Sequence, residues 1–98
     1  MKEVEKFFAC FPKSTSILFS LSESLSDEEE YLLTEYNSIM LFKKRILSPC
    51  LFLFADDTIT IHIGTNNEKV VSLIENNISF FLKDIDMTFA LVGVSNRV

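Results

Sequence analysis

The chain has 98 residues, of which 48% are hydrophobic, and 14 acidic against 9 basic residues give it a formal net charge of −5. This length predicts one domain, residues 1–98, with a core that needs no metal or disulfide support, and the apolar fraction excludes a disordered class. The negative charge argues against binding to a nucleic-acid backbone or an anionic membrane surface, because both require concentrated positive charge. No apolar run approaches the roughly 18 residues that a membrane span needs.

The first predicted element is a short amphipathic helix over residues 2–11. Its apolar positions recur at i, i+3, i+4 and i+7, and they are Val4, Phe7, Phe8 and Phe11. Pro12 ends this helix, and its early glutamates are not typical of a signal peptide. A strand is expected over residues 17–22, with alternate apolar residues on one face.

The second predicted helix covers residues 27–47. Ser26 is a good N-cap, and Glu29 three residues later completes a capping box. Acidic residues fill the first turn and basic residues the last, as the helix dipole favours. The expected apolar face comprises Leu32, Leu33, Tyr36, Ile39, Met40, Ile46 and Leu47. The alternative is a break near Asn37 with residues 39–47 extended, but the agreement of caps and charges at both ends favours one helix.

A hairpin and a further helix and strand complete the chain. An apolar run over residues 51–54 precedes an Asp-Asp turn, and in residues 58–63 isoleucines alternate with polar residues, which is the period of a half-buried strand. A third helix is expected after Asn67, with Asn77 the one polar residue on its apolar face. A last strand is expected over residues 87–94.

This order of elements predicts an α+β fold. Short connections and right-handed crossovers favour a ferredoxin-like βαββαβ arrangement, an antiparallel four-stranded sheet in the order 4-1-3-2 with two helices on one face. The extra N-terminal helix is expected to cover part of the other face. The side chains predicted to be mostly buried are Phe7, Phe8, Phe19, Leu32, Tyr36, Met40, Phe52, Ile61, Ile74, Ile78, Phe81 and Phe89.

In this topology three connections lie at one end of the sheet: first strand to second helix, the hairpin turn, and third helix to last strand. They carry nine of the 14 carboxylates, here called the acidic pole: Glu23, Asp27, Glu28, Glu29, Glu30, Asp56, Asp57, Asp84 and Asp86. Only Lys83 is a basic neighbour in sequence, whereas residues 43–45 place three cations at the opposite end. Two interpretations stay open. Each carboxylate serves only its own helix end, turn or loop, or together they form a binding site for a basic protein partner.

Other chemistry-bearing residues give weaker signals. His62 is the only histidine and could act as a general base, but a lone histidine beside no motif is more typical of an ordinary sheet residue. The aspartates of the acidic pole suit a hard cation, yet they lack the spacing of a known loop. We therefore predict no catalytic residue, no metal and no cofactor. Cys10 and Cys50 are expected to be buried free thiols in a cytoplasmic protein, since a secreted disulfide scaffold uses more cysteines.

A small acidic α+β domain without catalytic motifs is most simply a binding protein. In composition and polarity the whole chain resembles, at the level of the class, the immunity proteins of bacterial toxin–immunity pairs, including those of contact-dependent growth inhibition systems. The resemblance implies a cytoplasmic monomer or weak dimer that covers the active or substrate-binding site of a basic, nuclease-type toxin. Two alternatives stay open: a small-molecule-binding regulatory domain that dimerises through its sheet, and a phage-type inhibitor that mimics nucleic acid.

Overall fold

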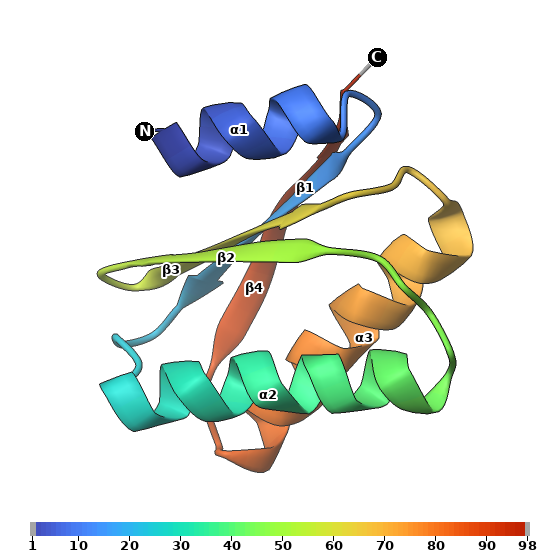
Figure 1. The fold of residues 1–98 in the computed structure, drawn as a ribbon. Helices are drawn as coiled ribbons and strands as arrows, with labels where there is room; N and C mark the ends of the chain where they lie inside the picture. The colour runs from blue at the N-terminus through green and yellow to red at the C-terminus, as the bar shows by residue number, and fades with distance from the viewer. Residues whose placement is uncertain (1, 98) are drawn as a thin grey trace.

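Three helices and four strands follow one another in the order α1–β1–α2–β2–β3–α3–β4 (Figure 1). The computed structural model describes residues 2–97. The helices are α1 (Lys2–Cys10), α2 (Asp27–Lys43) and α3 (Glu68–Asp84). The strands are β1 (Thr15–Leu21), β2 (Cys50–Ala55), β3 (Thr58–Ile63) and β4 (Phe89–Asn96). None of the helices in this range is both long and apolar enough to cross a membrane.

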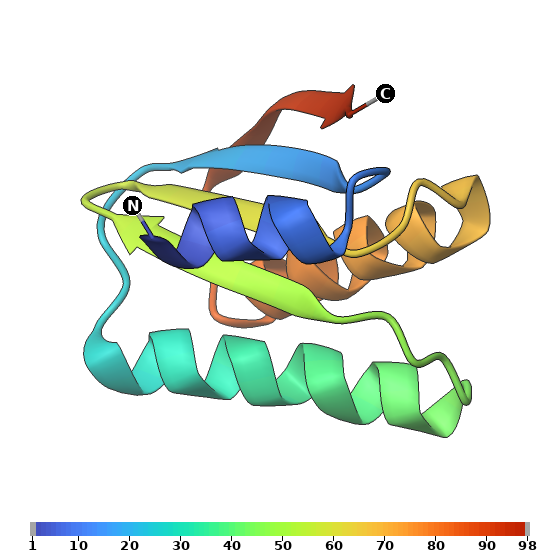
Figure 2. The ribbon, with the colours of Figure 1, turned by 45° about the horizontal axis from the view of Figure 1, so that its top comes forward.

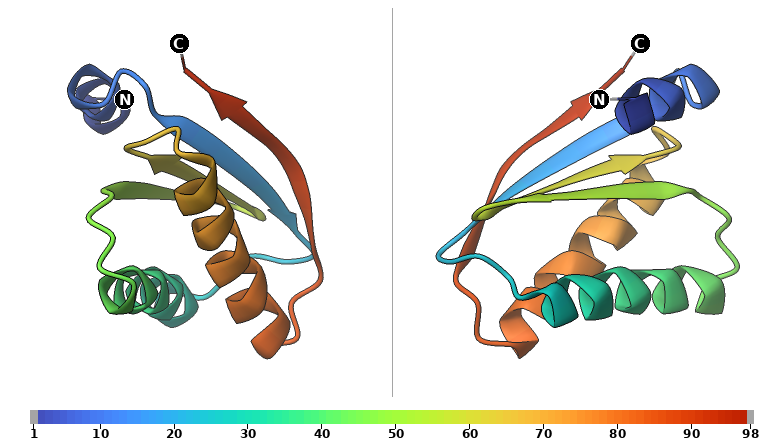
Figure 3. Two further views of the ribbon diagram at one scale, coloured as in Figure 1. Left: turned by 90° about the vertical axis from the view of Figure 1, so that its right-hand side faces the viewer. Right: turned by 60° about the vertical axis from the view of Figure 1, so that its left-hand side comes forward.

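The four strands form one antiparallel sheet in the order β2-β3-β1-β4, which is the predicted order 4-1-3-2 read from the other edge. Helices α2 and α3 cover one face of this sheet, as the left panel of Figure 3 shows. Helix α1 lies on the opposite face (Figure 2), where the extra helix was expected. Strand boundaries differ from the prediction by two residues at most, since β1 begins at Thr15 and β4 runs from Phe89 to Asn96.

Side-chain caps fix the starts of the two long helices. The predicted capping box is present: Ser26 Oγ accepts the backbone N–H of Glu29 at 3.1 Å, and Glu29 Oε1 accepts the N–H of Ser26 at 2.9 Å. At the start of α3, Asn67 Oδ1 accepts the N–H groups of Lys69 and Val70. These bonds satisfy N–H groups that the first helical turn leaves without partners.

Helix α2 is unbroken in its middle but ends at Lys43, four residues earlier than predicted. Arg45 takes a left-handed conformation, with φ of 57°, and its N–H donates to the carbonyl of Phe42 at 3.0 Å. The N–H of Ile46 donates to the carbonyl of Leu41 at 3.0 Å. This pair of bonds is a Schellman motif, which turns the chain out of the helix. The sequence does not predict this early helix end, because the left-handed position holds arginine instead of the usual glycine.

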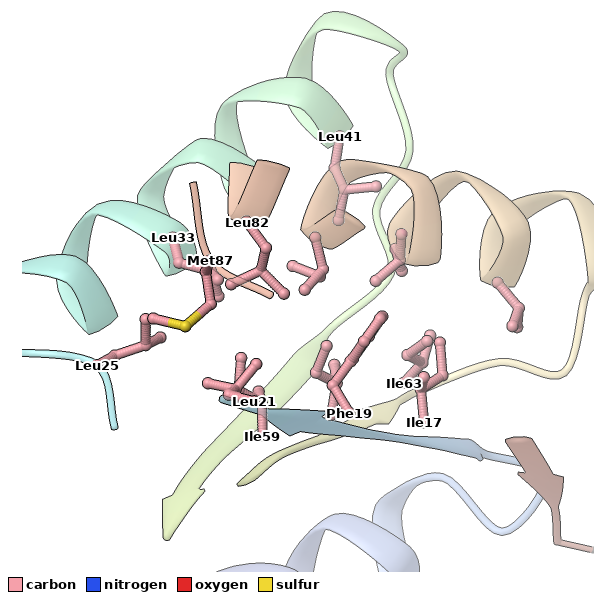
Figure 4. Packing of buried hydrophobic residues seen from close by; sticks show 14 residues of the cluster. Ile17, Phe19, Leu21, Leu25, Leu33, Leu41, Ile59, Ile63, Leu82 and Met87 are labelled. Carbon is pink, nitrogen blue, oxygen red and sulfur yellow. The ribbon is translucent and has the colours of Figure 1, made fainter. Parts of the chain in front are cut away.

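The core lies between the sheet and α2–α3 (Figure 4). Four of the twelve predicted core side chains are fully buried: Phe19, Ile61, Ile74 and Ile78. Seven are half-buried: Phe7, Phe8, Tyr36, Met40, Phe52, Phe81 and Phe89. Leu32, in contrast, is 44% exposed, so its assignment to the core was wrong. Helix α2 carries apolar residues on all sides, and the ones it buries are Leu33 and Leu41.

A polar pair is buried between α2 and α3. Asn37 is 1% and Asn77 is 4% exposed, and Asn77 Nδ2 donates to Asn37 Oδ1 at 3.0 Å. Asn37 Nδ2 also lies 3.9 Å from Cys50 Sγ on β2. A buried amide must find hydrogen-bond partners, so this pair accepts only one alignment of the two helices.

Candidate functional site

The end of β1 brings the three acidic connections together. The N–H of Leu21 donates to the carbonyl of Asp57 in the hairpin turn at 2.7 Å. The next N–H, that of Ser22, donates to the carbonyl of Thr88 in the connection between α3 and β4 at 2.8 Å. From there the chain continues directly into α2, and the right panel of Figure 3 shows the three connections on the same side of the molecule. The acidic pole is therefore one region of the folded chain.

The carboxylates of the acidic pole lie mostly in solvent. Seven of the nine residues are exposed, while Glu29 and Glu30 are half-buried. The carboxylate of Glu29 has a structural role, because it accepts a hydrogen bond in the α2 cap. The dipole of α2 also stabilises the negative charges of the other acidic residues in its first turn. Unit charges about 8 Å apart in water repel by roughly 0.5 kcal/mol. Nine of them around one end create a negative field that attracts cationic groups.

Two of these carboxylates stand on tight turns with left-handed backbone. Asp56 has φ of 52° in the hairpin turn, and Asp86 has φ of 59° directly after α3. The N–H of Met87 donates to the carbonyl of Leu82 at 2.9 Å, which closes a Schellman motif around Asp86. Aspartate tolerates this conformation better than most residues. These turns fix the backbone conformation at Asp56 and Asp86, from which the two carboxylates project.

An apolar stripe, interrupted by the exposed Glu35, runs along the outer face of α2 and starts at the acidic pole. It consists of Tyr31, Leu32, Ile39 and Phe42, which are 64%, 44%, 51% and 81% exposed. Their spacing places them on one side of the helix, next to Glu28. Sequence reasoning missed this stripe, since Leu32 and Ile39 were assigned to the buried face. The sequence did contain one indication of an exposed apolar surface, because α2 has more apolar residues than one buried helix face can hold.

His62 lies beneath α1 on the sheet face away from the core. It is 8% exposed, and its Nδ1 is 2.6 Å from Ser16 Oγ on the neighbouring strand. The Phe8 ring meets the imidazole edge-on, with centroids 4.9 Å apart, and the Arg97 guanidinium lies 3.9 Å from the centre of the Phe8 ring. Burial, followed by the charge of Arg97, lowers the pKa of His62 below 6.5.

The His62–Ser16 pair combines the residue types of a base and a nucleophile. Catalysis would also require substrate to reach Ser16 and a group that stabilises the developing charge. Helix α1 instead covers the imidazole with two aromatic rings. The pair is best explained as two polar groups that satisfy each other under the helix. Ser16 was not singled out in the sequence, although the antiparallel register places it opposite His62.

The two cysteines differ in their surroundings. Both are free, but Cys10 is exposed, so the expectation that it is buried was wrong. It lines a shallow hollow between the end of α1 and Leu51 of β2. Cys50 is half-buried, and burial raises the pKa of its thiol to about 11 against an opposing hydrogen bond from Asn37. A thiol with so high a pKa is a poor nucleophile and metal ligand at neutral pH.

Within residues 2–97, no three His, Cys, Asp or Glu side chains are grouped so that they could hold a metal ion. No known protein-family model matches the chain, and no curated protein is significantly similar to it in sequence. The acidic pole and the apolar stripe beside it are therefore interpreted from their geometry alone.

Proposed function

We propose that this protein binds and neutralises a basic protein, with the acidic pole as its docking surface, as immunity proteins of bacterial toxin–immunity pairs do. The observation that carries the proposal is the convergence of three separate connections, each acidic, around the end of β1. Each connection has a local use for one or two carboxylates, but none of these uses requires the three to be acidic together. The βαββαβ order and the strand order support a ferredoxin-like arrangement, which generates this convergence.

The apolar stripe supplies apolar surface that a partner can bury, which a purely charged surface lacks. Stable interfaces combine an apolar centre containing aromatic residues with a polar rim. Tyr31 and Leu32 lie one helical turn beyond Glu28, so a partner that touches the start of α2 can contact both kinds of surface at once. Charge then accelerates the encounter, and burial of the stripe slows dissociation.

A nuclease-type toxin fits this surface chemically. Its substrate-binding site must attract phosphates and is therefore rich in lysine and arginine. Carboxylates that occupy this site satisfy the same cations and exclude the nucleic acid. The proposal places the complex in the cytoplasm, where such a toxin would act.

The experiment is protection of growth. An immunity function predicts a gene directly upstream whose C-terminal domain is the basic toxin, and this domain is expressed in cells with and without this chain. The unmodified chain should restore growth, and a variant carrying Glu28→Gln, Asp56→Asn and Asp57→Asn should not. Asparagine suits position 56 because it also tolerates left-handed backbone. Ser26 and Glu29 remain unchanged so that the α2 cap is kept.

The matched control removes three exposed carboxylates outside the acidic pole, through Glu3→Gln, Glu5→Gln and Glu68→Gln. It changes the net charge by the same amount and should protect as well as the unmodified chain. Equal loss of protection in both variants would show that net charge matters and the acidic pole does not. Failure of the unmodified chain to protect against this domain would refute the immunity function.

A further inference from the structure

Strand β4 forms an open edge of the sheet. Only β1 pairs with it, so its other side presents a row of backbone N–H and C=O groups without strand partners. With eight residues, β4 is longer than the other three strands, and seven of its residues are exposed. The segment Phe89–Asn96 contains no proline and no charged residue. Natural edge strands commonly carry such residues, because they prevent pairing with another chain.

The opposite edge of the sheet is better covered. Strand β2 has six residues, and five of them are half-buried. A hollow beside it is lined by Phe7 and Phe11 of the α1 region together with Leu51 of β2. Both edge strands lack a second strand partner, but β4 is the longer and the more exposed of the two, and the left panel of Figure 3 shows it at the rim of the sheet.

Apolar side chains of β4 are exposed on both faces of the sheet. Leu91 and Val94 are opposite the core residues Phe19 and Ile17 of β1, yet they are 41% and 46% exposed. Val92 lies at an irregularity of the β1–β4 pairing and is 59% exposed. A strand that added to this edge would cover apolar surface in addition to backbone groups.

We propose that β4 pairs antiparallel with β4 of a second copy of this chain, which gives a two-fold symmetric dimer with a continuous eight-stranded sheet. The charges flanking the strand favour a second copy in this direction. Asp84 and Asp86 precede β4, whereas Arg97 follows it and is bonded through its N–H to Ser14, next to Lys13. Antiparallel pairing brings the acidic start of one strand to the basic end of the other, and parallel pairing would bring like charges together.

The register of β4 is self-complementary. Pairing Leu91 with Val94 of the other copy keeps both on the core face, and the same register pairs Val92 with Gly93 on the outer face. Gly93 has open space around the position of a Cβ, because no atom outside its two chain neighbours lies within 4 Å of that position. The Val92 side chain of the second copy can therefore occupy this space. Contact along one strand falls below the roughly 1,200 Å² of a standard interface, so the dimer should be weak.

Sedimentation equilibrium between 5 and 500 µM tests the proposal. The unmodified protein should dimerise with a dissociation constant on the order of 100 µM, as suits a small interface. Val92→Lys should weaken dimerisation at least tenfold, since lysine on an edge strand opposes pairing. Ile39→Lys on the exposed stripe of α2 is the matched control and should leave the constant unchanged. Thermal melting checks that both variants are folded.

A charge exchange tests the antiparallel direction. The double variants Asp84→Lys/Asp86→Lys and Lys13→Glu/Arg97→Glu should each dimerise several-fold more weakly, and their equimolar mixture should associate again. Position 86 accepts lysine because Arg45 occupies the same left-handed position after α2. The proposal is overturned by a protein that is monomeric at 500 µM, by a dimer that survives Val92→Lys, by a dimer that Ile39→Lys dissociates, or by a mixture that stays monomeric. None of these substitutions is among those that test the growth protection, so either proposal can fail alone.

Discussion

Replacing one member of the buried Asn37–Asn77 pair should destabilise the fold more than replacing both. In Asn77→Leu, Asn37 Oδ1 loses the donor that lies 3.0 Å away, while the side chain remains only 1% exposed and cannot turn to water. A buried polar group left without its partner costs about 1–3 kcal/mol of unfolding free energy. The leucine recovers part of this by burying apolar surface, so we expect a net loss of about 1–2 kcal/mol.

The double variant Asn37→Leu/Asn77→Leu removes both polar groups together. No amide then remains buried without a partner, and the two leucines pack among apolar residues of α2 and α3. The only other side-chain bond lost is the contact of Asn37 with Cys50 Sγ, which is long at 3.9 Å. We expect stability within about 1 kcal/mol of the unmodified protein, which corresponds to a favourable coupling of roughly 2 kcal/mol between the two sites.

Urea unfolding followed by circular dichroism measures the free energy of unfolding of the unmodified protein, the two single variants Asn37→Leu and Asn77→Leu, and the double variant. The slope against denaturant should be the same in each, which shows that folded and unfolded states have kept their exposed areas. If the double variant loses the sum of the two single losses, the asparagines act independently and the hydrogen bond does not hold the helices in register.

Three further predictions concern single residues. Cys10 should react with a thiol reagent within seconds to minutes, whereas the half-buried Cys50, whose thiol pKa is raised, should react far more slowly until the protein unfolds. Reductant should leave the melting temperature unchanged. Equally fast labelling of both cysteines would contradict the raised pKa of Cys50. The folded state lowers the pKa of His62, so below pH 6.5 the unfolded chain binds more protons than the folded protein does. The contribution of His62 to the free energy of unfolding is therefore constant above this pH and decreases as the pH falls below it. His62→Gln should flatten this part of the pH profile, and an unchanged profile would show that His62 does not cause the loss of stability. Arg45→Gly should raise stability by about 0.5–1 kcal/mol, because glycine adopts the left-handed backbone without strain, and a loss in urea unfolding would argue against that conformation.

Sequence patterns predicted the elements that have one clear period or cap. The alternating isoleucines of β3 predicted a strand, and the Ser26 cap predicted the start of α2. The structure confirms both predictions. Helix α2 was harder because apolar residues surround it, so periodicity could not tell the buried face from the exposed one. The buried face is selected by Asn37, whose partner Asn77 lies 40 residues away, and a pairing over this distance leaves no local pattern.

The candidate site divides in the same way. The convergence of the acidic connections follows from topology, so a correct order of elements was enough to place it. The apolar stripe beside it, and the pairing of Ser16 with His62, depend on which side chains face solvent or a neighbouring strand. Tertiary packing decides these features, because it overrides the local preference of each segment.

The most direct test of the acidic pole is the association rate with the toxin domain that the proposed immunity function requires, measured by stopped flow between 20 and 500 mM salt. The rate constant for the unmodified chain should fall at least tenfold over this range, because salt screens the negative field of the acidic pole. The Glu28→Gln/Asp56→Asn/Asp57→Asn variant should start lower and depend less on salt, whereas the Glu3→Gln/Glu5→Gln/Glu68→Gln control should follow the unmodified chain. Equal rates and equal salt dependence for the two variants would contradict docking at the acidic pole.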